Sequence, residues 1–198
     1  MLGNDVVDLE DPESRAEGLH PRFDHRVFTS EERAGLAGSL APDRDRWVLW
    51  AAKEAAFKAL RRLDPRVPFS PRRFETRLPV QAGTCWGSVR HGSRRLWVRA
   101  EVGPCLVHAV SGVAGEHGVP LAAVGPVPDG PNDPRRASHE ARRLARVGLA
   151  RALELPTDAL DFDRVARLPR LRVAGRATAL PLSFSHHGRF AAFAALLP

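Results

Sequence analysis

Between residues 47 and 60 the apolar positions would cover nearly the whole circumference of a helix. This pattern predicts a helix that is buried on most of its faces. The segment contains no Gly or Pro and is rich in Ala and Leu. Glu54 and Lys58 are four positions apart, so they lie on one face of this helix. An ionised pair in apolar surroundings must be matched or have a function. The alternative is an ordinary i,i+4 surface pair.

Residues 2–9 form a short apolar run centred on two valines, which predicts a strand. Gly3 and Asn4 come before Asp5 and indicate a backbone that another segment approaches closely. Asp5 lies inside the apolar run rather than at its edge. It is either a ligand carboxylate or an Asp at the start of a strand that makes a local turn bond.

After residue 69 the pattern becomes that of short strands separated by Gly, Pro and Ser. The predicted strands are residues 74–80, 86–90, 95–102 and 106–111, with a hairpin turn at residues 90–93. Residues 115–134 are dense in Gly and Pro and predict a connector with at most one further strand. We expect two halves joined there: residues 1–114 and residues 135–198.

The second half begins with a predicted helix over residues 135–155, which carries leucines and alanines on one face and arginines, including Arg142, on the other. That arginine face is either solvated or binds phosphate. Residues 162–178 are basic and are predicted to be irregular. Strict alternation up to Ser185, a tight turn at residues 187–188 and an apolar return segment predict a terminal hairpin.

Composition narrows the class of protein. The chain has 198 residues, of which 43% are hydrophobic, and it lacks an apolar run long enough to span a bilayer. The acidic start of the chain lacks the features of a signal peptide, so we expect a cytoplasmic protein that does not bind membranes. Cys85 and Cys105 belong to no CxxC pattern and are expected to be reduced thiols.

The formal net charge is +7, which comes mainly from arginine because Lys53 and Lys58 are the only lysines. A basic balance suggests a polyanionic partner: nucleic acid, an acidic carrier protein or a phosphate-rich cofactor. Asp5 and Glu54 are the two carboxylates that a magnesium ion takes from protein when phosphate and water fill its other positions. Lys58 would reach the same phosphates, and Ser185 and His186 add further donors. These groups suit a pyrophosphate-linked substrate.

The residues resemble a known family. GNDVV at residues 3–7, FTSEE at residues 28–32 and WAAKEAAFK at residues 50–58 are similar to consecutive motifs of the 4'-phosphopantetheinyl transferases. The resemblance implies magnesium bound by Asp5 and Glu54, and coenzyme A held partly by Lys58. It also implies catalysis by Asp5, Glu54 and Lys58, with the phosphopantetheine arm transferred to a serine of an acyl or peptidyl carrier protein and 3',5'-ADP released.

The second half also resembles this family, in an unexpected order. Residues 135–162, PRL at 169–171 and LSFSHHGRF at 182–190 are similar to the N-terminal half of the surfactin-synthetase-type members, so the order of motifs looks circularly permuted. The resemblance implies that Ser185 and His186 hold the coenzyme phosphates, assisted by Arg142 and Arg170. Three positions depart from the family pattern. Val7 stands where many members have a second acidic residue, the usual Gly-Lys-Pro survives only as Leu168-Pro169-Arg170, and His187 replaces a residue that is often Ser.

We therefore expect an α+β fold of two pseudo-symmetric halves, each with a long helix packed on a small antiparallel sheet, and an active site between them. The expected protein is a monomeric, magnesium-dependent transferase. The alternative is a non-catalytic module of similar fold that binds coenzyme A or an acidic partner protein. Nucleic-acid binding fits the charge but explains neither Asp5 nor the two lysines.

Overall fold

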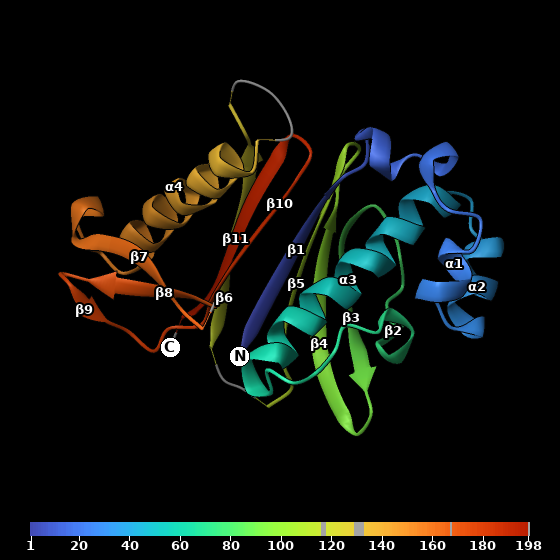
Figure 1. Ribbon diagram of the computed structural model, residues 1–198, viewed down its shortest axis with the longest axis horizontal. Helices are drawn as coiled ribbons and strands as arrows, with labels where there is room; N and C mark the ends of the chain where they lie inside the picture. The colour runs from blue at the N-terminus through green and yellow to red at the C-terminus, as the bar shows by residue number, and fades with distance from the viewer. Residues whose placement is uncertain (116–117, 129–132, 167, 198) are drawn as a thin grey trace.

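The fold is described from a computed structural model for residues 1–115, 118–128, 133–166 and 168–197. Its helices are α1 (Phe23–Val27), α2 (Ser30–Ala37), α3 (Pro42–Leu63) and α4 (Pro134–Ala152). Its strands are β1 (Leu2–Asp8), β2 (Glu75–Arg77), β3 (Gly83–His91), β4 (Arg94–Val102), β5 (Leu106–Val113), β6 (Val119–Pro126), β7 (Leu160–Val165), β8 (Leu168–Val173), β9 (Arg176–Ala177), β10 (Leu182–His187) and β11 (Phe190–Leu197). None of the helices in these ranges is long and apolar enough to cross a membrane. Figure 1 shows their arrangement.

The first half forms a five-stranded antiparallel sheet with the strand order β1-β5-β4-β3-β2. The strands predicted after residue 69 are confirmed, although β2 is shorter than its predicted range. The predicted turn closes the β3–β4 hairpin, where Gly92 has a φ of +59°. The predicted first strand corresponds to β1, which lies at one edge of the sheet.

Helix α3 crosses one face of this sheet (Figure 1) and confirms the predicted buried helix. It begins at Pro42, with Asp43 and Asp45 in the first turn, where carboxylates interact favourably with the helix dipole. Small side chains fill the face toward the sheet: the alanines at positions 51, 52, 55, 56 and 59 are each 0% exposed. The helix can therefore lie close to the strands.

Gly3 is the point of closest approach between β1 and α3. A Cβ atom at this position would lie 2.2 Å from the Ala55 carbonyl oxygen and 2.5 Å from the Ala59 backbone nitrogen. Any side chain here would push α3 away from β1. The expected close approach of another segment to this backbone is confirmed, and it brings the neighbouring Asp5 next to the helix.

The second half contains two three-stranded antiparallel sheets. Helix α4 packs on the sheet β10-β11-β6, and the smaller sheet β7-β8-β9 lies beside it (Figure 1). Leu149 of α4, Leu160 of β7 and Phe193 of β11 are buried in a common core. The predicted helix and terminal hairpin are both confirmed, with Gly188 in the turn at a φ of +52°.

The prediction that residues 162–178 are irregular is wrong, because β8, β9 and most of β7 lie there. Arg170 and Arg172 of β8 both pair with Asp163 of β7, at N–O distances of 2.6 Å and 3.1 Å. Cross-strand charge pairs stabilise these strands. Because charged residues occupy these strand positions, the alternation of apolar and polar residues that would identify the strands from sequence is weak in this segment.

The predicted connector holds one strand, β6, which pairs with β11 of the second half. Residues 116–117 and 129–132 of the connector lie outside the described residues. The structure thus has helices packed on antiparallel sheets, as an α+β fold requires. The two halves differ in the number and arrangement of strands, so their pseudo-symmetry and the domain boundaries remain predictions.

His108 of β5 is a buried titratable group in this fold. It is 2% exposed, and its Nε2 lies 3.1 Å from the Asn4 side-chain amide nitrogen. Burial, with smaller contributions from the charges of Arg99 and Lys58, lowers the pKa of His108 to about 4 from its ordinary value of 6.5. The neutral imidazole is therefore the form that fits the folded protein.

We expect His108 to make stability depend on pH. The unfolded chain protonates this side chain below about pH 6.5 and the folded protein only near pH 4, so its contribution is complete above pH 6.5 and is lost as the pH falls toward 4. The loss should reach roughly 3 kcal/mol. Urea unfolding of the wild type and of His108→Gln at a series of pH values measures it. A difference between the two proteins that stays constant from pH 7 to pH 4 would contradict this expectation.

Candidate active site

Asp5 of β1 and Lys58 of α3 form an ion pair at the junction of strand and helix. The Lys58 ammonium donates to Asp5 Oδ1 over 2.7 Å and to the Asn4 carbonyl oxygen over 3.1 Å. The Asp5 side chain is 12% exposed and that of Lys58 is 31% exposed. The Lys58 ammonium therefore pairs with Asp5 and does not form the i,i+4 surface pair with Glu54 that was the alternative.

Glu54 lies one helical turn before Lys58 and shares the electrostatic environment of Asp5. Burial and, to a smaller extent, the negative charge of Asp5 raise the pKa of Glu54 to about 7, while the charge of Lys58 opposes both effects. Two carboxylates thus repel each other beside a single ammonium group. Such a donor set fits a divalent cation, because the cation would relieve this repulsion through oxygen ligands.

Ser185 and His186 of β10 come from the other half of the chain and reach the same junction. The Ser185 hydroxyl donates to Asp5 Oδ1 over 3.1 Å, and its side chain is almost completely buried. His186 is exposed, but partial loss of solvent around its ring and the nearby charge of Lys58 lower its pKa, while Asp5 opposes this shift. The structure therefore brings Asp5, Glu54, Lys58 and Ser185 together, whereas the exposed ring of His186 is near enough to be affected by the charges of Lys58 and Asp5.

A cavity of about 360 Å³ adjoins Lys58 and is lined by four cationic side chains, Lys58, Arg61, Arg62 and Arg164. None of the residues that line it in the described part of the chain is acidic. Phe57 and Phe184 supply apolar surface in the same cavity. A ligand with several negative charges and a flat apolar part would suit this lining.

Arg62 is the most unusual cation of this cavity. Burial lowers the pKa of its guanidinium to about 10, and no carboxylate of the described residues opposes this shift. Among the described residues, its one hydrogen bond is to the carbonyl oxygen of Leu182. A desolvated charge without an acidic partner is costly, so this site favours an anionic ligand.

Arg142 and Arg170, which the resemblance assigned to the coenzyme, lie at the margins of the cavity. The Arg142 guanidinium stacks 5.7 Å from the centre of the Phe184 ring, and Arg170 is paired with Asp163. Their contacts with coenzyme remain predictions.

The sequence analysis did not identify Arg62 as a site residue, although the sequence contained a signal for it. Arg62 follows Lys58 at the same i+4 spacing that separates Lys58 from Glu54.

Asp8, the acidic residue nearest to Val7, is not available to a metal ion. It is 1% exposed and accepts hydrogen bonds from the Arg189 side chain at 2.8 Å through each of its two oxygens. Arg189 follows the β10–β11 turn, so this pair joins the two halves. The ion pair and its further bonds to backbone N–H groups keep the pKa of Asp8 below its usual value, although burial opposes the shift.

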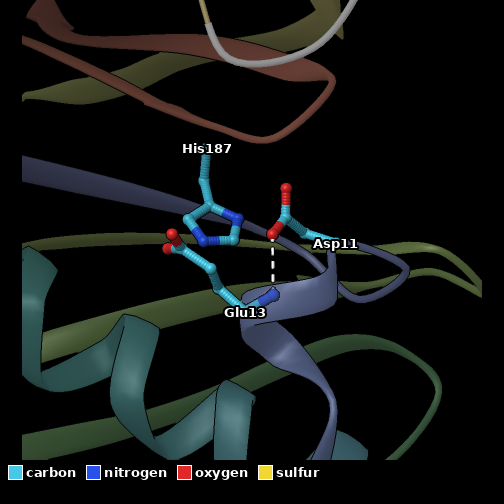
Figure 2. A group of neighbouring side chains, drawn as sticks. All are labelled: Asp11, Glu13 and His187. Atoms are coloured by element: carbon cyan, nitrogen blue, oxygen red, sulfur yellow. Dashed lines mark hydrogen bonds between the residues drawn. The ribbon is translucent and has the colours of Figure 1, made fainter. Parts of the chain in front are cut away.

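A second group of metal-ligating side chains, Asp11, Glu13 and His187, lies at the far end of β1 (Figure 2). Local hydrogen bonds explain two of them. Asp11 Oδ1 accepts the backbone N–H of Glu13 at 2.9 Å, as the cap of a short 3₁₀ helix (Pro12–Ser14). His187 Nδ1 accepts the backbone N–H of Asp8 at 3.1 Å, so the proton of the neutral ring lies on Nε2 and that nitrogen cannot ligate a cation.

Larger hollows are also present, among them two of about 760 and 780 Å³. The first lies between α2, the start of α3 and the segment after β2, and contains none of the residues brought together at Asp5. The second shares Arg62 with the smaller cavity but is otherwise lined mainly by apolar residues. The smaller cavity, unlike these two, is lined by a candidate catalytic group, Lys58.

Comparison with known proteins agrees with this geometry. Residues 1–100 match the family model described as ACPS, the 4'-phosphopantetheinyl transferase superfamily. The matched range contains Asp5, Glu54 and Lys58, whereas Ser185 and His186 lie outside it. No curated protein matches the chain.

Proposed function

This chain belongs to the 4'-phosphopantetheinyl transferase superfamily, and we propose that it transfers the phosphopantetheine arm of coenzyme A to a serine of an acyl or peptidyl carrier protein. The observation that carries the proposal is the ion pair of Asp5 and Lys58 near Glu54, together with the cavity that Lys58 lines with three arginines. Phosphoryl transfer requires this combination, since catalysis depends on positioning the pyrophosphate and stabilising its charge.

Asp5 and Glu54 would hold a magnesium ion. Both carboxylates lie near Lys58, and burial together with repulsion from Asp5 raises the pKa of Glu54, which supports a site that gains from a bound cation. When bound, the ion would polarise the pyrophosphate as a Lewis acid. Val7 is buried and apolar at the place where many members of the family have a further acid, so the chain supplies two carboxylates here.

The other steps of the proposed transfer involve the carrier serine and side chains of this protein. The serine hydroxyl of the carrier attacks the phosphorus that bears the pantetheine arm, and the bond from this phosphorus to 3',5'-ADP breaks. Glu54, or a water ordered by the ion, would accept the hydroxyl proton. Lys58, Arg61 and Arg62 stabilise the charge of the departing nucleotide.

The test is a modification assay. The protein is incubated with magnesium, coenzyme A and a panel of apo carrier proteins, and the carriers are then weighed by mass spectrometry. We expect at least one carrier to gain the phosphopantetheine arm. If every carrier keeps its original mass while an established transferase modifies the same panel, the proposed activity is wrong.

A coenzyme A titration separates the transferase from a binding module that lacks catalysis. A site that uses Asp5 and Glu54 through an ion should lose much of its coenzyme affinity in EDTA. A module that holds the coenzyme through its arginines alone should keep the same affinity with and without magnesium.

Replacing Arg62 by methionine should weaken coenzyme A binding by about tenfold to a hundredfold, because a charge-assisted contact to phosphate is lost. The free energy of unfolding should stay the same or increase, since a desolvated cation without an acidic partner is removed. Calorimetric titration and urea unfolding measure the two quantities. Arg66→Met is the matched control, because Arg66 is exposed and pairs with Asp64. Equal coenzyme affinities for the two variants would contradict the assignment.

A further inference from the structure

The outer edge of β1 is covered by side chains instead of by another strand. Alternate N–H groups of an edge strand point away from its sheet and need acceptors. The N–H groups of residues 4, 6 and 8 each find one on β10: Ser183 Oγ at 3.1 Å, Ser185 Oγ at 3.0 Å and His187 Nδ1 at 3.1 Å. We call these three contacts the β1 side-chain ladder.

The ladder fixes the register between the two halves. Its donors and its acceptors both advance by two residues, which is the period of a strand. β1 is the edge of the five-stranded sheet and β10 is the edge of the sheet that carries the second half. A shift of one residue would turn the serines and the histidine away from β1. The Ser-His segment therefore has a structural task in joining the halves.

Ser185 differs from the other two members because it also contacts Asp5. Its oxygen accepts the Val6 N–H, and its single proton is donated to Asp5 Oδ1 at 3.1 Å. The side chain is 5% exposed. Both the donor and an acceptor site of this hydroxyl are thus used within the protein.

Asp5 Oδ1 receives both the Ser185 hydroxyl and the Lys58 ammonium, whereas Oδ2 accepts no hydrogen bond from any described residue. The two donors fix the orientation of the carboxylate, so that Oδ2 is always the oxygen left available to a ligand. A preoriented ligand binds more tightly than a freely rotating one, because less entropy is lost on binding.

We infer that Ser185 is a positioning residue that holds the Asp5 carboxylate in place for a divalent cation, rather than a direct contact of the coenzyme phosphates. The inference rests on the proposed function, since the cation is the one that Asp5 and Glu54 would share. Ser183 provides a matched comparison because it makes the same type of bond to β1 but none to a carboxylate.

The experiment uses Ser185→Ala and Ser183→Ala in the full chain. Magnesium affinity is measured by calorimetry without coenzyme, coenzyme A affinity is measured in EDTA, and backbone amide exchange is measured by NMR without either ligand. We expect Ser185→Ala to weaken magnesium binding by about tenfold, to leave coenzyme binding in EDTA unchanged, and to speed exchange of the Val6 amide. Ser183→Ala should speed exchange of the Asn4 amide and leave magnesium binding unchanged.

Two results would overturn the inference. One is a Ser185→Ala protein with wild-type magnesium affinity and weaker coenzyme binding, which is the behaviour of a phosphate contact. The other is an equal loss of magnesium affinity in both variants, which indicates a general loosening of the junction. If the wild type binds no magnesium even with coenzyme A present, the proposed function fails together with the positioning role, while the Val6 and Asn4 exchange rates still test the ladder itself.

Discussion

Glu54→Gln should slow modification of a carrier protein by a factor of ~10² to ~10⁴, which is the range typical for loss of a general base. The amide keeps the size of the side chain but cannot accept the serine proton and is a weaker ligand for magnesium. Relief of carboxylate burial should leave the folded protein at least as stable as the wild type, since the raised pKa of Glu54 shows that its charge is unfavourable there. Initial rates of carrier modification, followed by mass spectrometry, give the effect.

Glu31→Gln is the control for this variant. Glu31 is exposed on α2 and is not among the residues brought together at Asp5, so its replacement should leave the rate within about twofold of wild type. A Glu54→Gln protein that keeps the wild-type rate would show that neither the base nor the metal ligand has been identified correctly.

Lys53→Met should lower the free energy of unfolding by about 3 to 5 kcal/mol, because it leaves a buried carboxylate without its partner. Lys53 is 0% exposed, and its ammonium donates to Glu32 Oε1 and Oε2 at 2.9 Å and 2.8 Å. It also donates to the carbonyl oxygens of Pro71 and Phe74. Burial lowers the pKa of Lys53, and the charge of Glu32 opposes this shift. Urea unfolding at pH 7 measures the loss.

The double variant Lys53→Met/Glu32→Gln distinguishes charge from packing. With both charges removed, most of the stability lost in Lys53→Met should return, because the isolated carboxylate was its main cause. Glu32 Oε1 also accepts the Thr76 N–H at 2.7 Å, and a glutamine oxygen can keep that bond. A double variant as unstable as the single one would contradict the electrostatic explanation.

The sequence predicted the parts of the site whose signal is local. The apolar helix with two charges on one face and the carboxylate inside a strand made Asp5, Glu54 and Lys58 candidates, and the resemblance to the family implied that they share a site. The spacing from Glu54 singled out Lys58 for the site, whereas no sequence pattern assigned a role to Lys53. Lys53 is a buried structural cation paired with Glu32, whereas Lys58 faces Asp5 and the cavity, and this difference depends on which side of α3 each neighbouring element packs.

Other features depend on contacts between distant segments and left no local pattern. The hydroxyl of Ser185 reaches Asp5 across 180 positions of sequence, so its role could be seen only after the two halves were assembled. The strands between residues 160 and 177 were missed because Asp163, Arg170 and Arg172 neutralise one another across the sheet. Arginines in a strand resemble those of a solvated loop until their partners are known.

A crystal structure of the protein with coenzyme A and magnesium tests the central claim most directly. The account predicts one ion bound by oxygens of Asp5 and Glu54, with the coenzyme phosphates in the cavity of Lys58, Arg61, Arg62 and Arg164. An ion at Asp11, Glu13 and His187, or a coenzyme bound away from this cavity, would contradict it.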